Sequence, residues 1–479
     1  MNETAVLDLA VIGSGGAAMA AAIAARQAGK TVVLVEAGTL GGTCVNIGCV
    51  PSKTLLAAAG ARHTALTNPF CGAATSAGPV DLGALVAQKD ELVTQLRQAK
   101  YADVVDAYGV EVVAGLARFT DPDTLSVDGR ALPARAYLIA TGAKPARADL
   151  SGLHQVDWLT STTAMELSEL PESLVVIGGG YVGLEQAQLF AHLGTRVTLI
   201  GRVAPASEPE LADVLRAVFT DDGITVIEEH AVAVVTADPV RVDRPGRLDT
   251  HAVPERRVVV TTRSGQRITA ERVLVATGRT PRTAALDLDA AGVKTDERGF
   301  VVVDVHQRTS NPRIYAAGDV SGAPQYVYAA AATGQVAARN AIGATGTHPA
   351  TVDYTGLPAV IFTRPQLACA GLTEAQALAA GHRCETRVLD LSAVPRALAN
   401  RDTRGAVKLV ADADTGRVLG VHAAAEAAGE IMLAATYAIK AGMTIEQIAD
   451  TWAPYLTMAE SLRLVAGSFR TTMPASCCA

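Results

Sequence analysis

The chain has 479 residues, a length that suits about three domains and a large hydrophobic core. Hydrophobic residues make up 49% of the chain and charged residues 19%, a composition that excludes an intrinsically disordered protein. The 41 basic and 48 acidic residues give a net charge of −7. This balance excludes the basic footprint of a nucleic-acid-binding or membrane-surface protein.

The cysteine content indicates the compartment. Seven cysteines in a chain of this length are too few for a secreted disulfide scaffold. The apolar stretch Leu7–Ile23 contains Asp8 and lacks a basic region before it, so we expect neither a signal peptide nor a membrane span there. The expected location is the cytoplasm, where paired cysteines tend to be catalytic or metal-binding.

The first of two similar βαβ segments covers residues 5–36, with an Ala-rich helix and a second strand at Thr31–Val35. Its turn carries Gly13-x-Gly15-x-x-Ala18. Glycines in such a turn let the backbone approach a pyrophosphate, and the helix N-terminus supplies N–H donors. Glu36 follows the second strand and suits a ribose hydroxyl. These features predict an FAD site.

The second βαβ segment covers residues 173–200 and carries Gly178-x-Gly180-x-x-Gly183. No acid follows its second strand; Arg202 lies there instead, and an arginine suits a 2′-phosphate. We therefore expect an NADPH site, with a solvated surface arginine as the alternative for Arg202. The expected elements are the strand Leu174–Ile177, a helix near Leu184–Leu193 and the strand Arg196–Ile200.

Other short motifs divide the rest of the chain. Thr141-Gly142 and Thr277-Gly278 follow apolar strands and are expected where the chain crosses between domains, with Thr141 and Gly142 at the FAD site and Gly278 at the NADPH site. Asp319 ends an apolar strand that begins at Ile314, at the edge of the sheet where ligands bind.

The nucleotide motifs stop near Thr351, where a third domain is expected to begin. The predicted fold is α/β, with two Rossmann-like nucleotide-binding domains and an α+β C-terminal domain for dimerisation. The predicted domains are 1–150 with 280–350 for FAD, 151–279 for NAD(P)H and 351–479 for the interface. The last is expected to contain strands at Ala406–Val410 and Arg417–His422 and a helix at Glu430–Ala441.

Cys44 and Cys49 follow Gly41-Gly42-Thr43, in which Gly42 and Thr43 are expected to join the FAD site. On a regular helix their Cα atoms would lie roughly 8–9 Å apart, beyond the ~6.8 Å limit for a disulfide. Gly48 and Pro51 predict instead that the pair lies in unwound chain at the start of a helix through residues 52–59. A helix N-terminus favours a thiolate. The alternative is two buried, inert cysteines.

The segment Gly-Gly-Thr-Cys-Val-Asn-x-Gly-Cys-Val-Pro-Ser-Lys, together with both glycine turns and Ala-Ala-Gly-Asp319, resembles the pyridine nucleotide–disulfide oxidoreductases over essentially the whole chain. The resemblance implies that NADPH reduces FAD and that the flavin reduces a Cys44–Cys49 disulfide. Cys49 would lie nearest the flavin, and Cys44 would exchange with substrate. It also implies a Lys53–Glu185 pair beside the flavin and contact between Asp319 and the FAD ribitol.

The C-terminal region departs from the family members that reduce thiol substrates. Those enzymes use a histidine held by a glutamate, and here the corresponding positions are Tyr455 and Glu460. An unperturbed tyrosine has a pKa near ~10, against ~6.5 for histidine, and is a poor proton shuttle at neutral pH. The chain then ends in Cys477-Cys478-Ala479. Adjacent Cα atoms lie ~3.8 Å apart, too close for an unstrained disulfide, so two free thiols suit a soft metal ion. The alternative is a tail with two stray cysteines.

Both features, and the stretch Pro395–Asn400, resemble the mercuric reductases within that family. The resemblance implies a homodimer in which Cys477 and Cys478 of one subunit bind Hg(II) and pass it to Cys44 and Cys49 of the other. It also implies that Tyr181 and Tyr455 flank the metal.

Several alternatives remain open at this point. Tyr181 could instead gate the nicotinamide or pack in the core. The chain begins directly at the FAD strand, so we expect the catalytic core without an N-terminal metal-binding module. The rival functions are a flavin disulfide reductase of another thiol substrate and a metal-sequestering flavoprotein. We expect Cys71, Cys369 and Cys384 to be buried packing residues.

Overall fold

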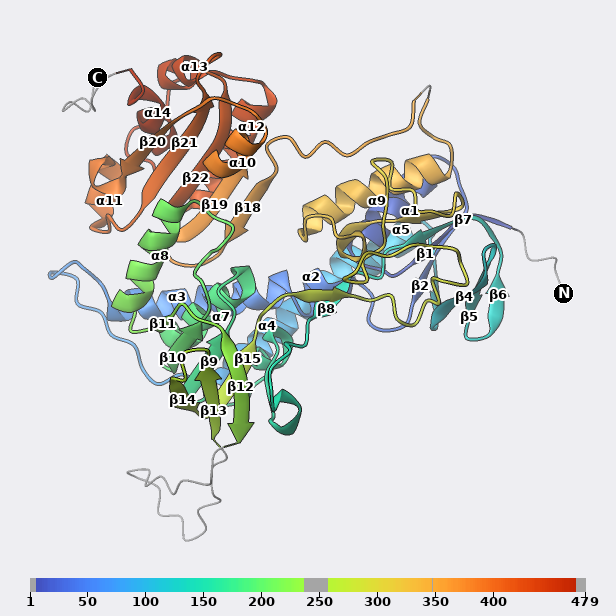
Figure 1. Cartoon of the computed structure of the whole chain (residues 1–479), viewed down its shortest axis with the longest axis horizontal. Coiled ribbons are helices and arrows are strands. Elements are labelled where there is room, and N and C mark those ends of the chain that lie inside the picture. The colour runs from blue at the N-terminus through green and yellow to red at the C-terminus, as the bar shows by residue number, and fades with distance from the viewer. Residues whose placement is uncertain (1–5, 237–256, 347, 471–479) are drawn as a thin grey trace, which may run out of the picture. The chain divides into compact units, whose positions relative to one another are not determined.

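The computed structural model describes residues 6–236, 257–346 and 348–470 (Figure 1). It divides into two compact units. The first unit contains Met1–Thr54, Ala84–Ala146 and Gly278–Asp353, and the second contains Leu55–Gly83, Arg147–Thr277 and Tyr354–Ala479. Among the described helices, none is long and apolar enough to span a membrane.

The first unit is built on a five-stranded parallel sheet in the order β17-β7-β1-β2-β3. Alternate residues of β1 point to opposite faces, as the period of a strand requires. Leu9 and Val11 pack with α1 and α9 on one face, and Ala10 and Ile12 pack with Phe119 on the other. The strands are β1 (Leu7–Ile12), β2 (Val32–Glu36), β3 (Glu111–Ala114), β7 (Ala134–Ile139) and β17 (Ile314–Ala316).

Small residues let the two long helices of this unit approach closely. α1 (Gly16–Gln27) is rich in buried alanines, and a Cβ on Gly334 of α9 (Val327–Ala341) would lie 2.1 Å from the Ala17 carbonyl oxygen. The other elements of this unit are α2 (Gly42–Asn46), α5 (Asp103–Ala107), most of α4 (Leu82–Arg97), the antiparallel strands β4 (Ala117–Asp121), β5 (Thr124–Val127) and β6 (Arg130–Leu132), and the pair β8 (Ala143–Pro145) and β16 (Arg279–Pro281).

The second unit repeats the parallel design in its nucleotide-type part, with strand order β11-β10-β9-β15. β10 has the bounds that the sequence predicts, whereas α7 begins at Tyr181, three residues earlier than expected. The elements are β9 (Ser173–Ile177), α6 (Ser161–Ala164), α7 (Tyr181–Leu193), β10 (Arg196–Ile200), α8 (Pro209–Asp221), β11 (Thr225–Ile227), β15 (Arg272–Val275) and the antiparallel strands β12 (Ala231–Thr236), β13 (Val258–Thr262) and β14 (Arg267–Ala270).

The C-terminal part of this unit is a five-stranded antiparallel sheet, in the order β18-β19-β22-β21-β20, which packs with α12 and α14 in one core. Its elements are β18 (Pro358–Ile361), β19 (Gln366–Gly371), α10 (Glu374–Ala379), β20 (Cys384–Asp390), α11 (Pro395–Asn400), β21 (Ala406–Asp412), β22 (Val418–Ala425), α12 (Ala428–Lys440), α13 (Ile445–Asp450) and α14 (Glu460–Gly467). The expected fold class, two parallel nucleotide-type sheets followed by an α+β part, is confirmed. The division into three domains with the bounds given above stays a prediction.

Candidate active site

The first glycine turn packs so closely against its neighbours that side chains would not fit. Gly13 has φ +112°, and a Cβ there would lie 2.4 Å from the Ala140 carbonyl oxygen. Gly15 caps α1, and a Cβ on Gly42, at φ +63°, would lie 2.6 Å from the Gly15 Cα. The turn therefore brings backbone segments together at the N-terminus of α1 without intervening side chains, as the binding of a pyrophosphate by backbone N–H groups requires. Ala18, the third residue of the motif, is fully buried in α1.

Glu36 ends β2, and its carboxylate is held in place from two sides. The Ser14 hydroxyl donates to Oε2 at 2.5 Å, and the Gly38 backbone N–H donates to Oε1 at 2.7 Å. A carboxylate has about four acceptor positions, so lone pairs remain for ribose hydroxyls. The structure therefore leaves Glu36 able to fill its expected role.

Asp319, which follows β17, lies close to Arg279, and the first unit contains polar atoms that are buried without hydrogen bonds. Within the described residues, Thr141 Oγ1 and Arg279 Nε are buried and have no hydrogen-bond partner. Arg279 Nε lies 3.6 Å from Asp319 Oδ2, and burial raises the pKa of Asp319 although Arg279 opposes the shift. Buried polar atoms cost free energy unless they are paired, so these groups fit a polar ligand such as the ribitol and phosphates of FAD. The sequence analysis missed Arg279, although it directly follows Gly278.

The structure brings Cys44 and Cys49 together, but not in unwound chain. Cys44 lies in α2, and Cys49 is the first residue of α3 (Cys49–Leu66), so the expectation of unwound chain is wrong, whereas the expected helix through residues 52–59 lies within α3. The two helices are separated only by Ile47 and Gly48. A Cβ on Gly48 would lie 2.9 Å from the Thr43 carbonyl oxygen, so the tight connection requires a glycine.

The two thiols interact directly. A hydrogen bond with Cys49, together with burial, raises the pKa of Cys44, and the nearby charge of Lys53 opposes the shift only in part. Cys44 is half-buried, whereas Cys49 is exposed. The pair is therefore two chemically different sulfurs at the start of α3.

Tyr101 is a neighbour of the cysteine pair that the sequence analysis missed. It lies in a single π-helical turn, Gln98–Ala102, and its ring is 3.4 Å from where a Cβ on Gly41 would lie. Burial, with the two thiols nearby, raises the pKa of Tyr101 to about 12, so the phenol keeps its proton. No motif in the sequence marks this turn.

The second glycine turn has the same construction as the first. Gly178 has φ +118°, and a Cβ on Gly183 would lie 1.8 Å from the Gly178 carbonyl oxygen. Gly180 caps α7 beside open space, and Tyr181 begins the helix. Arg202 is exposed two residues beyond β10. This turn therefore leaves helix N–H groups and an accessible arginine for a dinucleotide phosphate.

The remaining predicted residues are distributed over both units. Glu185 Oε1 accepts a 3.0 Å hydrogen bond from the Phe362 backbone N–H in the second unit, whereas Lys53 belongs to the first, so their pairing stays a prediction. Gly142 (φ +69°) and Gly278 (φ +135°) both belong to the first unit and face open space.

Tyr455 and Glu460 line one surface pocket of about 420 Å³ together with Trp452 and Arg463. Tyr455 is 54% exposed, whereas Glu460 is buried and lies 3.4 Å from Arg463. Among the described side chains, the Oε2 atom of Glu460 is one of the buried polar atoms without a hydrogen-bond partner.

Cys477 and Cys478 lie outside the described residues. Cys71 is exposed, so the expectation that it packs in the core is wrong, and Cys369 and Cys384 are only partly buried.

Two nucleotide-type sheets, two glycine turns and a cysteine pair at a helix start define a flavin- and nicotinamide-dependent dithiol enzyme as the class. The chain belongs to the pyridine nucleotide-disulphide oxidoreductases: that family matches residues 7–334, and the dimerisation domain of the same family matches residues 357–466.

Named relatives are more specific than the family. The chain is 52% identical to mercuric reductase from Streptomyces lividans, with 98% of each chain covered. It is 46% identical to mercuric reductase from Lysinibacillus sphaericus, with 98% of this chain and 84% of the relative covered. Among solved structures, the HOCl-induced flavoprotein disulfide reductase RclA from Escherichia coli is similar, with a TM-score of 0.82, 28% identity and coverage of 96% and 99%.

Proposed function

We propose that this protein is a mercuric reductase, which uses electrons from NADPH to reduce Hg(II) to Hg(0). The observation that carries the proposal is the directly interacting Cys44–Cys49 pair at the start of α3, in a chain 52% identical over 98% of its length to a mercuric reductase. Two thiolates are the ligands that a soft metal ion prefers. The balanced reaction is Hg(II) + NADPH → Hg(0) + NADP⁺ + H⁺.

FAD and NADPH are the cofactors of this family, and the residues described above fit them. FAD supplies hydride acceptance and electron transfer to the cysteines. At the FAD site, Glu36 would accept hydrogen bonds from the ribose hydroxyls, and the Gly13–Gly15 turn would bind the pyrophosphate. Thr141, Arg279 and Asp319 would form hydrogen bonds with the remaining polar groups of FAD. The Gly178–Gly183 turn and Arg202 bind the nicotinamide dinucleotide and its 2′-phosphate.

The cysteine pair binds the substrate. Cys44 keeps its proton until the metal arrives, because hydrogen bonding with Cys49 and burial raise its pKa. Binding of Hg(II) replaces that proton, and the two sulfurs hold the ion while it accepts two electrons. Lys53 stabilises negative charge on the sulfurs, and Tyr101 remains a neutral donor beside them.

A metal substrate also explains the absence of a C-terminal histidine. The last histidine of the sequence is His422, and Tyr455 stands where thiol-reducing relatives need a proton shuttle. No sulfur leaving group of an organic substrate has to be protonated when a metal ion is reduced. The rival, a reductase of a thiol substrate, has to work without that histidine.

The family's dimerisation domain indicates a homodimer. Exposed Leu433 and Tyr437 on α12 and the 98% exposed Trp452 supply apolar surface for the partner. We propose that Cys477 and Cys478 of one subunit deliver Hg(II) to Cys44 and Cys49 of the other, that the protein works in the cytoplasm, and that the domains are 1–150 with 280–350, 151–279 and 351–479.

The test is NADPH oxidation by the purified protein with Hg(II) and excess thiol, with volatile mercury collected and measured. Stoichiometric Hg(0) release supports the proposal. Robust activity with an oxidised low-molecular-weight disulfide and none with Hg(II) would instead identify a thiol-substrate reductase. Binding of Hg(II) without NADPH turnover would identify a metal-sequestering flavoprotein.

A further inference from the structure

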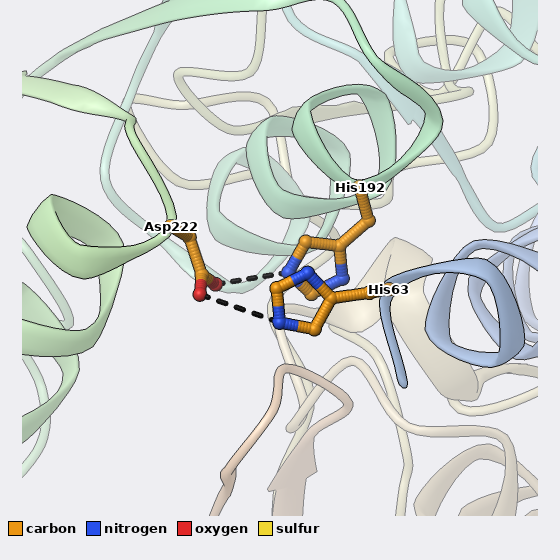
Figure 2. Close-up of side chains that lie close together, drawn as sticks. All are labelled: His63, His192 and Asp222. Atoms are coloured by element: carbon orange, nitrogen blue, oxygen red, sulfur yellow. Dashed lines mark hydrogen bonds and ion pairs between the residues drawn. The ribbon is translucent and has the colours of Figure 1, made fainter. Parts of the chain in front are cut away.

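Three side chains that are far apart in the sequence meet inside the second unit (Figure 2). His63 lies in α3, His192 in the last turn of α7, and Asp222 directly after α8; their side chains are 15%, 4% and 3% exposed. His192 Nε2 is 2.9 Å from Asp222 Oδ2, and His63 Nε2 is 3.6 Å from Oδ1. The two imidazole rings are stacked, with centroids 3.7 Å apart and planes 14° apart.

Two histidines and a carboxylate are a common ligand set for Zn²⁺, but the ring arrangement argues against a shared ion. A metal binds imidazole in the ring plane at about 2.0–2.1 Å from nitrogen. Two nearly parallel rings stacked at 3.7 Å cannot both contain one ion in their planes. The carboxylate also accepts a 2.8 Å hydrogen bond from Gln188 and has Arg404 Nη1 at 3.9 Å. The geometry is that of a hydrogen-bonded cluster.

The charges around the cluster oppose protonation of His63. Burial lowers the pKa of His63 to about 4, and His192, Arg364 and Arg404 add to the shift while Asp222 opposes it. Burial disfavours the Asp222 charge, but the hydrogen bonds from His192 and Gln188 and the nearby charges of His192 and His63 together outweigh burial, so the pKa of Asp222 is lowered. From the helix of His63 itself, Arg62 donates to the His192 carbonyl oxygen at 2.8 Å. Acid therefore places a positive charge on the buried His63 ring, stacked on His192 and close to Arg364 and Arg404.

Each histidine lies on a helix that begins at a residue of the proposed mechanism. His63 follows Cys49 by 14 positions, so at ~100° per residue it lies ~40° from the same side of α3, about 21 Å along the axis. His192 follows Tyr181 by 11 positions and lies ~20° from its side of α7.

Hydrogen bonds hold the same side of α7 in place along the length of the helix. Glu185 accepts from the Phe362 N–H, and Gln188 exchanges hydrogen bonds of 2.7 and 2.9 Å with the backbone of Arg364. Arg364 also reaches α3, where it donates to the Gly60 carbonyl oxygen and the Thr64 hydroxyl. Hydrogen bonds therefore tie both helices to one another around the cluster.

We infer that His63, His192 and Asp222 form an acid-sensitive anchor that fixes the part of α3 in the second unit against α7, and that the anchor steadies, along the continuous helix α3, the helix start that carries Cys49. The anchor is closed while His63 is neutral, and it opens when His63 takes up a proton beside His192 and the arginines. The roles of Cys49 and Tyr181 rest on the proposed function, whereas the anchor itself does not.

The test compares the holoenzyme with two variants. The first, His63→Gln, cannot be protonated at this position, and the second, His382→Gln, is the matched control. His382 also pairs with an aspartate, Asp412, at 2.9 Å in the same unit, but it is 37% exposed. Two quantities are followed from pH 8 to pH 4. One is the thermal midpoint, and the other is the ratio of iodoacetamide labelling at Cys44 to that at Cys71 in the NADPH-reduced protein, read by mass spectrometry.

We expect the wild type and His382→Gln to lose thermal midpoint as the pH falls from 6.5 to 4, with at least a threefold rise in the Cys44:Cys71 ratio. His63→Gln should flatten both profiles. Two outcomes would overturn the anchor. One is that the thermal and labelling profiles of His63→Gln below pH 6.5 match those of the wild type, and the other is that His382→Gln flattens the profiles as well. Because neither readout uses Hg(II), a failure of mercury reduction with these profiles intact would contradict only the proposed function.

Discussion

The Ser14 hydroxyl donates a 2.5 Å hydrogen bond to the Glu36 carboxylate and accepts a 3.0 Å hydrogen bond from the Gly41 N–H. One side chain thus joins the first glycine turn, the end of β2 and the loop that leads to Cys44. The first glycine turn and the loop that precedes Cys44 therefore share one hydrogen-bonded support in the first unit. Several consequences of this arrangement can be measured.

Replacing Glu36 with Gln should weaken FAD binding by about 10- to 100-fold. The change removes a charged acceptor for ribose and the anchor of Ser14, and hydrogen bonds to charged groups contribute about 1.5–3 kcal/mol. Equilibrium release of FAD, followed by flavin fluorescence, measures the effect. Glu297→Gln, at an exposed glutamate of the same unit, is the control. An unchanged dissociation constant for Glu36→Gln would exclude Glu36 from the FAD site.

Replacing Gly42 with Ala should lower stability and FAD retention more than replacing Gly29 with Ala. Both glycines have left-handed φ angles, +63° and +72°, which cost a side chain about 1–2 kcal/mol. Only at Gly42 would the new Cβ also meet backbone, 2.6 Å from the Gly15 Cα, whereas Gly29 faces open space. We expect an additional loss of about 1–3 kcal/mol for Gly42→Ala. Chemical denaturation of both variants measures the difference, and equal losses would contradict the close approach.

The reactivity of Cys44 should depend on pH in a defined direction. Its pKa is raised by the hydrogen bond with Cys49 and by burial, so its thiol stays protonated at neutral pH. Because only the thiolate is nucleophilic, labelling of Cys44 by iodoacetamide in the reduced protein should be at least about tenfold slower than that of Cys71 at pH 7 and should accelerate as the pH rises above 9. Equal labelling of the two residues at pH 7 would contradict the protonated state of Cys44.

Arg202→Gln should reduce the preference for NADPH over NADH. If the guanidinium binds the 2′-phosphate, its loss should raise the KM for NADPH about tenfold or more and leave the KM for NADH nearly unchanged. Steady-state kinetics with both nucleotides measure this, with Arg263→Gln, another exposed arginine of the same unit, as the control. Unchanged KM values for both nucleotides would show that Arg202 is only a solvated surface residue.

The double variant Cys477→Ala, Cys478→Ala should impair turnover of thiol-ligated Hg(II) about tenfold or more while NADPH still reduces the flavin at the wild-type rate. The tail thiols are proposed to take the metal from external thiols. They take no part in the reduction of the flavin by NADPH. Stopped-flow absorbance of the flavin and mercury release give the two rates. Slower flavin reduction in the variant would exclude the proposed role of the tail.

The local motifs were sufficient for much of this structure. The glycine spacing predicted both turns, because a close backbone approach and a positive φ restrict those positions to glycine. The bounds of β10 and the positions of α1 and α7 followed from strand and helix periods. The motif around Cys44 and Cys49 predicted their proximity. It did not predict that Cys44 lies in a helix of its own, because the break at Gly48 is set by packing against Thr43.

The sequence by itself determined the class of the protein, since the two glycine turns and the cysteine motif are short-range patterns whose chemistry is readable from adjacent residues. Only the tertiary structure decided which distant side chains share a site. Arg279 meets Asp319, Tyr101 lies beside the redox loop, and His63 stacks on His192 because separate strands and helices pack there. None of these contacts has a fixed spacing along the chain, so the burial that shifts the pKa values of Asp319, Tyr101 and His63 has no signature in the sequence.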